Sequence, residues 1–140
     1  MTSCVFLLLV VNSLSGLSPA SSQSWEQFEK KHIDDSVRGG GNVYCYSEIR
    51  NRGITAARGQ CKPKNTFIHS PSNTIKGLCT GIVGSQYITS NNPYYLTHCE
   101  HLSLIPQEMP PNCNYMAYNY YKPIMIKCDG GTPVHFEKIM

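Results

Sequence analysis

The sequence predicts an α+β fold, with helices first and an antiparallel sheet afterwards. Three observations predict it. Residues 25–33 carry apolar groups at helical spacing, the chain beyond Cys61 alternates short β-rich runs with turn residues, and six cysteines fall within residues 23–140. The cysteine count adds three disulfides to the expected fold.

The N-terminal segment, residues 1–22, is expected to be a secretory signal peptide. Its apolar run over residues 5–11 is shorter than the about 20 residues that a membrane-spanning helix needs, and small residues precede the cleavage point after Ser22. A buried core helix is the alternative, but no amphipathic period follows the run. Cleavage leaves one domain, residues 23–140, whose N-terminal Gln23 can cyclise.

The chain has a mild excess of positive charge. It contains 12 Lys and Arg against 9 Asp and Glu, a net charge of +3, and all of these residues lie in the expected mature domain. This excess favours an anionic partner such as nucleic acid. It is a modest charge for a protein that disrupts bacterial membranes.

Two helices are expected at the start of the domain. In the first, over residues 25–33, Phe28 and His32 are four residues apart and therefore share a face. The second is expected over residues 44–52 and is stopped by Gly53.

Six β-rich runs follow Cys61. They cover residues 65–69, 81–89, 94–99, 114–121, 123–128 and 133–139. Turn residues separate several of them, at residues 71–73, 91–93 and 129–131.

The cysteines indicate a secreted, disulfide-bonded domain. Cys4 lies in the expected signal peptide, and an even six remain. Zinc binding is the alternative, but the chain has no C-x2-C pair, and its nearest cluster is His98, Cys99 and His101. Spacing alone does not choose among the possible disulfide connectivities.

Three short motifs carry the candidate chemistry. FEKKH ends at His32, CKPKNTF contains Lys62, and PVHF contains His135. A single histidine or lysine is more often a surface or core residue than a catalytic one. Together, in this order among six cysteines, the motifs resemble the pancreatic ribonuclease superfamily over the whole of residues 23–140.

Two branches of that superfamily are especially similar. WEQFEKKHI and CKPKNTFIHS resemble the amphibian cytotoxic ribonucleases, whose N-terminal pyroglutamate falls on Gln23, and IRNRGIT with NTFIH resembles the angiogenins. The resemblance implies a member from a fish or another lower vertebrate. It also implies a bent sheet and the disulfide pairs Cys45–Cys99, Cys61–Cys113 and Cys79–Cys128.

The resemblance implies a catalytic set that uses no metal and no cofactor. His32 is the general base and His135 the general acid of transphosphorylation, and Lys62 supplies a cation toward the phosphate oxygens. Two imidazoles suit these roles because their ordinary pKa lies near 6.5. Glu137 stands where the family has an aspartate that orients the acid, and it is one methylene longer.

Four further residues are expected to bind substrate. Lys31 implies a second phosphate-facing cation, because the amphibian branch also has lysine there, and Asn65 ties the backbone of the site together. Thr66 matches the pyrimidine-reading position, and Phe136 matches an aromatic beside the base. Two neighbours are left open, because Lys64 is solvated surface or an RNA contact and His69 is structural or exposed.

The expected protein is a secreted, monomeric endoribonuclease that cleaves single-stranded RNA 3′ of pyrimidines through a 2′,3′-cyclic phosphate. The alternative is an angiogenin-like signalling or antimicrobial protein with weak or incidental nuclease activity. For that role Arg50 and Arg52, with Arg58, are candidates to bind a cell-surface receptor or polyanion before uptake into the cell and nucleus. A solvated loop beside a helix end is the simpler interpretation of these arginines.

Overall fold

The computed structural model describes residues 24–102 and 108–140. The expected signal peptide therefore lies outside the described residues. Within the described ranges, no helix has the length and apolar character needed to cross a membrane.

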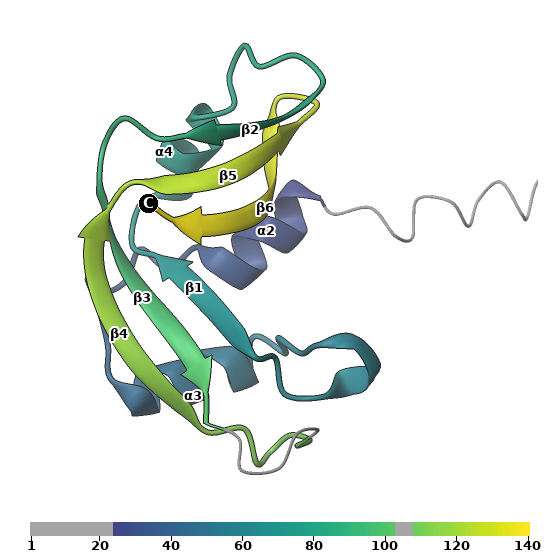
Figure 1. Ribbon diagram of the computed structural model, residues 1–140, viewed down its shortest axis with the longest axis vertical. Coiled ribbons are helices and arrows are strands. Elements are labelled where there is room, and N and C mark those ends of the chain that lie inside the picture. Colours follow the sequence, from purple (N-terminus) through teal and green to yellow (C-terminus); the bar gives the residue numbers. More distant parts are fainter. Residues whose placement is uncertain (1–23, 103–107) are drawn as a thin grey trace, which may run out of the picture.

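Six strands form two three-stranded antiparallel sheets (Figure 1). The strands are β1 (Lys64–Ile68), β2 (Ser85–Thr89), β3 (Tyr94–His101), β4 (Tyr115–Lys122), β5 (Ile124–Asp129) and β6 (Thr132–Ile139). One sheet has the order β1-β3-β4 and the other β2-β5-β6. Only Pro123 separates β4 from β5, so the chain bends there and passes from one sheet to the other.

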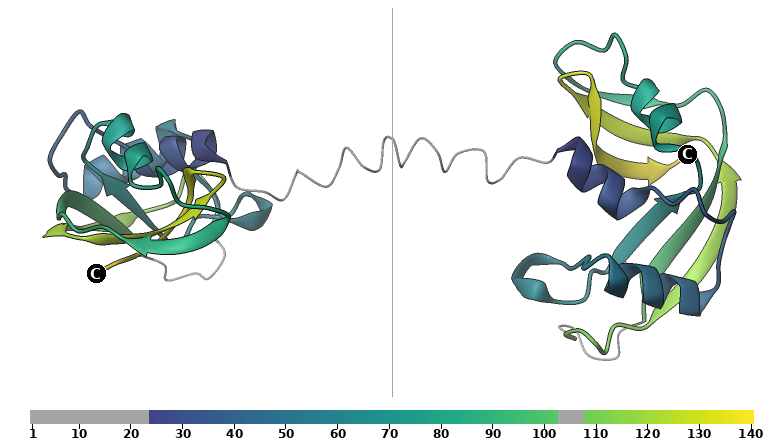
Figure 2. Two further views of the ribbon diagram at one scale, coloured as in Figure 1. Left: turned by 90° about the horizontal axis from the view of Figure 1, so that it is seen from above. Right: turned by 180° about the vertical axis from the view of Figure 1, so that it is seen from behind.

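Helix α2 (Trp25–His32) joins the two sheets, because it contacts β6 of one and β1 of the other. Ser24 caps it by accepting a hydrogen bond from the Gln27 amide at 3.1 Å. Helix α3 (Asn42–Asn51) packs on the sheet of β1, β3 and β4 (Figure 2). Both expected helices are present, with the second beginning two residues earlier than predicted.

A third helix, α4 (Ser72–Gly77), was not predicted, since Pro71, Ser72 and Asn73 indicate a turn. The turn continues into a helix because the amides of Thr74 and Ile75 donate to the Pro71 carbonyl and Ile75 is fully buried. A helix with one buried residue has no apolar period to detect. A 3₁₀ turn, η2 (Ala57–Gly59), was also missed.

The core has two parts. One lies between the sheets and includes Phe28, Ile68, Leu96 and Ile126. The other lies between α3 and its sheet and includes Phe67. Three disulfides brace the fold, and they are the pairs that the resemblance implies: Cys45–Cys99, Cys61–Cys113 and Cys79–Cys128.

Candidate active site

His32 is fixed at the last residue of α2. Phe28, one turn earlier on the same face, is 1% exposed and anchors the helix in the core. The His32 ring packs against Phe28 and donates from Nδ1 to the Thr66 carbonyl at 2.8 Å. Because a carbonyl only accepts, Nδ1 carries the proton and Nε2 is left as the basic nitrogen of the neutral ring.

The surroundings of His32 keep this imidazole neutral. Burial lowers its pKa to about 3, against the opposing effect of the Thr66 carbonyl, and the charges of Lys62, Lys31 and His135 lower it further. His135 is the neighbour in the chain of Phe136, whose ring lies 5.4 Å from the His32 ring. At neutral pH, His32 is therefore unprotonated at Nε2, and its pKa lies well below the ordinary imidazole value near 6.5 assumed from the sequence.

Asn65 links the Lys62 side chain to the backbone of Lys31. Its Oδ1 accepts from Lys62 Nζ at 2.9 Å, and its Nδ2 donates to the Lys31 carbonyl at 2.9 Å. Burial, and then the charge of Lys31, lowers the pKa of Lys62 to about 8. The charge of Lys31 disfavours the charged form of Lys62, and a bound anion would oppose this effect.

Strand β6 brings His135 and Phe136 to α2. The Phe136 and His32 ring centroids are 5.4 Å apart, and the ring planes are inclined by 28°. His135 is exposed, and its Nε2 lies 3.3 Å from Glu137 Oε1. The longer glutamate therefore still reaches the ring, and the contact leaves Nδ1 for a substrate.

The outer edge of β1 faces the same space. Residues of a strand direct their N–H and C=O groups to the same side, so the Thr66 amide points to the edge from which its carbonyl meets His32. β1 is an edge strand of its sheet, which leaves this amide for a ligand. The Thr66 side chain is 3% exposed and contacts His98 on β3 at 2.8 Å.

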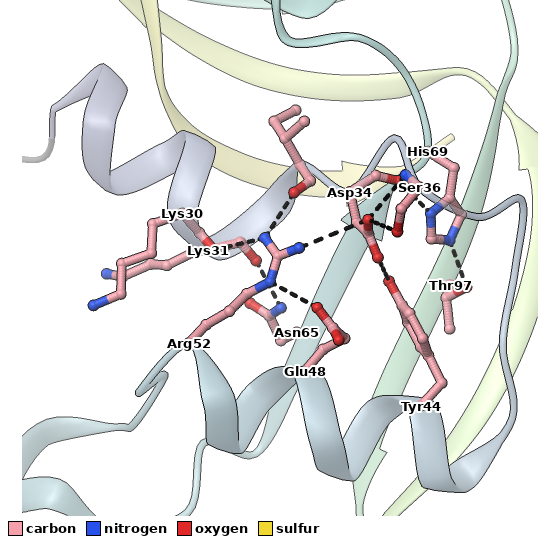
Figure 3. A network of polar contacts seen from close by, with 11 residues as sticks. Lys30, Lys31, Asp34, Ser36, Tyr44, Glu48, Arg52, Asn65, His69 and Thr97 are labelled. Carbon is pink, nitrogen blue, oxygen red and sulfur yellow. Dashed lines mark hydrogen bonds and ion pairs between the residues drawn. The ribbon is translucent and has the colours of Figure 1, made fainter.

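A polar network behind the site holds α2, α3 and β1 together (Figure 3). Asp34 accepts hydrogen bonds from the hydroxyls of Ser36 at 2.6 Å and Tyr44 at 2.5 Å. Burial alone would raise the pKa of Asp34, but these bonds and the charge of Arg52 lower it. His69 bonds the Asp34 carbonyl at 2.8 Å and the Thr97 hydroxyl at 2.7 Å, so it is buried and structural.

Arg52 belongs to this network, which bears on its predicted role, with Arg50 and Arg58, in binding a receptor or polyanion. Its guanidinium donates to the carbonyls of Lys30 at 3.0 Å and Ile33 at 2.7 Å, and to Glu48 at 3.0 Å. The prediction that Arg52 serves a receptor or polyanion therefore conflicts with its geometry, because its donors are engaged. Arg50 is exposed beside the Tyr46 ring.

His98 contacts a candidate site residue, Thr66, and the sequence did not reveal this contact. In the sequence analysis, His98 appears only in the zinc alternative, with Cys99 and His101. Cys99 is bonded to Cys45, and no group of three potential ligands is arranged to hold a metal among the described residues. The strand pairing of Thr66 with His98 is the signal that identifies it, and it depends on the register of β1 and β3.

The family assignment agrees with this geometry. The family model described as pancreatic ribonuclease matches residues 23–137. The chain therefore belongs to the pancreatic ribonuclease family and is an enzyme of that type.

Individual relatives come from both branches that the motifs indicate. Angiogenin-4 of Mus musculus is 35% identical over 144 residues, which cover 99% of this chain and 95% of that protein. Oocytes ribonuclease of Aquarana catesbeiana is 35% identical over 134 residues, covering 95% and 93%. The X-ray structure of zebrafish RNase5 matches with a TM-score of 0.68 at 29% identity, over 81% of this chain and 92% of that one. The predicted family and α+β fold are confirmed.

Proposed function

We propose that the protein is a secreted endoribonuclease that cleaves single-stranded RNA 3′ of pyrimidines through a 2′,3′-cyclic phosphate. The observation that carries the proposal is the hydrogen bond from His32 Nδ1 to the Thr66 carbonyl. This bond fixes the His32 ring against β1, an edge strand, and leaves Nε2 as its unprotonated nitrogen, which supports a role as the base. RNA supplies its own nucleophile there, because its 2′-OH lies next to the phosphorus.

In the first step, His32 Nε2 removes the 2′-OH proton while the 2′-oxygen attacks the phosphorus. The bond to the 5′-oxygen breaks, and His135 Nδ1 gives its proton to that leaving oxygen. In the second step the roles reverse: His135 takes a proton from water, the hydroxide opens the cyclic phosphate, and His32 returns a proton to the 2′-oxygen. Each positioned acid or base typically contributes about 10²–10⁴-fold in rate.

Lys62 stabilises the charge that grows on the non-bridging oxygens as the phosphorane forms. Its lowered pKa reflects a desolvated site with Lys31 nearby, and both effects are relieved when a phosphate enters. Asn65 keeps the Lys62 ammonium in place. Because DNA lacks the 2′-OH, it has no nucleophile for this route.

Thr66 is proposed to select pyrimidines. Its amide is placed to donate to a base carbonyl, and its hydroxyl, which both donates and accepts, suits either uracil or cytosine. The ring of Phe136 beside His32 offers the base a stacking surface.

Cleavage of the dinucleotides UpA, CpA and ApA tests the proposal. We expect wild type to cleave UpA and CpA, and His32→Ala and His135→Ala to lose at least about 10³-fold in kcat/KM. Lys30→Gln, which changes an exposed lysine of the same helix, serves as the control with near-normal activity. Equal cleavage of ApA contradicts the pyrimidine preference, and active histidine variants contradict the mechanism.

A signalling or host-defence role is the second candidate, and the 35% identity to mouse angiogenin-4 favours it. Since the family match begins at residue 23, where signal cleavage is expected, secretion is part of the proposal. Arg50 is then the candidate contact for a receptor or polyanion before uptake into the cell and nucleus. In a cell-binding assay, Arg50→Ala is expected to lose binding with RNA cleavage intact. Unchanged binding rejects this surface.

A further inference from the structure

Thr66, the proposed base-reading residue, is hydrogen-bonded to His98 on the neighbouring strand, and His98 is hydrogen-bonded in turn to Glu100. Thr66 and His98 are directly opposite in the β1–β3 register, and Thr66 Oγ1 lies 2.8 Å from His98 Nδ1. His98 Nε2 lies 2.8 Å from Glu100 Oε1. A chain of two hydrogen bonds therefore runs from Thr66 to an exposed carboxylate.

Glu100 fixes the direction of this chain. An ionised carboxylate only accepts, so His98 Nε2 must carry a proton and donate to it. In the neutral imidazole the other nitrogen, Nδ1, is then an acceptor. The Thr66 hydroxyl consequently donates a hydrogen bond to Nδ1. Its oxygen lone pairs are then free to accept a hydrogen bond from a base.

This direction matters because the two pyrimidines differ at N3. Uracil carries an N3–H, which the Thr66 oxygen can accept, whereas cytosine presents an N3 lone pair. When His98 gains a second proton, Nδ1 becomes a donor to the Thr66 oxygen. The Thr66 hydroxyl then no longer donates to His98, and its O–H can donate a hydrogen bond to cytosine N3.

We propose that the His98–Glu100 pair makes base selection depend on pH, favouring uridine when His98 is neutral and admitting cytidine when His98 is protonated. The inference rests on the proposed function, since it assigns a control to the same base pocket. His98 does not touch the reacting atoms and is therefore a positioning residue.

Charged and titratable groups face His98 from both neighbouring strands. On β3 itself, Glu100 contacts the ring, and on β1 the exposed Lys64 lies opposite Glu100. On β4, Tyr118 lies opposite His98 and is 46% exposed. Of these groups, the carboxylate is the one for which the described residues show a hydrogen bond to the ring.

The test is the ratio of kcat/KM for UpA to that for CpA between about pH 5.5 and 8, a window around the titration of imidazoles. His32, Lys62 and His135 serve both substrates, so their titrations cancel in the ratio. We expect the wild-type ratio to fall about three- to tenfold toward acid pH, as one hydrogen bond is reversed.

Four variants isolate the cause. His98→Ala frees the hydroxyl and should make the ratio independent of pH, and His98→Asp supplies a permanent acceptor and should hold the uridine preference throughout. Glu100→Gln should weaken the uridine preference at pH 8, because either tautomer then becomes possible. Tyr118→Phe changes the opposite residue without altering this chain and should behave as wild type.

A wild-type ratio that is constant with pH, or a pH-dependent ratio in His98→Ala, overturns the inference while leaving the proposed function standing. Calorimetric binding of uridine 3′-phosphate and cytidine 3′-phosphate supplies a second measurement that needs no turnover. A binding ratio that shifts with pH in a protein without cleavage activity supports this inference and overturns the proposed function. A binding ratio that stays constant counts against the inference in either case.

Discussion

Acid should destabilise this fold through His32, and the change in the free energy of unfolding with pH can be calculated. Burial lowers the pKa of His32 to about 3 in the folded chain, whereas an exposed histidine titrates near 6.5. Between these values the unfolded chain binds a proton at this site that the folded chain does not. Stability from this group is therefore fully present above pH 6.5 and is lost as the pH falls.

The expected loss is about 1.4 kcal/mol per pH unit for one proton, or about 4 kcal/mol between pH 6 and pH 3. This is a large part of the about 5–15 kcal/mol that stabilises a typical domain. His32 is only 8% exposed, so solvent screening does not diminish the effect. His32→Gln keeps a donor for the Thr66 carbonyl but does not titrate.

The assay is urea unfolding of the oxidised protein at intervals from pH 7 to pH 3, for wild type and His32→Gln. All other titrating groups are shared, so the difference between the two free energies of unfolding isolates His32. We expect the variant to be the less stable protein at pH 7 and to lose that disadvantage on acidification. Parallel profiles would refute the assignment of a buried, neutral His32.

The remaining predictions concern the cations and their supports. Lys31→Gln should raise the pKa of Lys62 from about 8 toward its ordinary 10.5, because a like charge is removed. NMR titration of the lysine Cε signals measures this pKa, and an unchanged value would show that Lys31 does not act on Lys62. Asn65→Ala should lower kcat on UpA by about tenfold or more, since Lys62 loses its acceptor, and normal turnover counts against this role. Arg52→Ala should cost about 2–4 kcal/mol in urea unfolding by stranding two carbonyls, while Arg50→Ala should cost less than about 0.5 kcal/mol. Equal effects would refute the structural role of Arg52.

Sequence reasoning succeeded where the determinants are local. The four-residue spacing of Phe28 and His32 predicts that they share a helix face, and both are buried. The string from Cys61 to Phe67 places Lys62, Asn65 and Thr66 within one turn and strand, so their proximity follows from chain continuity. The short runs and turn residues likewise predict the strands.

What sequence reasoning missed depends on long-range register. His98 becomes the partner of Thr66 only when β1 and β3 align, and no local pattern encodes that alignment. Arg52 resembles a solvated helix-end charge, and its bonds to two α2 carbonyls appear only when α2 and α3 meet. Helix α4 is too short to carry a periodic signal.

Among residues 24–102 and 108–140, no disulfide links one sheet to the other. Two disulfides lie with β1, β3 and β4, and the third ties the segment after α4 to β5. Since His135 belongs to one sheet and Thr66 to the other, non-covalent packing around Phe28 holds these two residues of the proposed site in place relative to each other. Mild denaturant is therefore expected to loosen the packing between the sheets first, so turnover would fade while both sheets still give their full circular-dichroism signal.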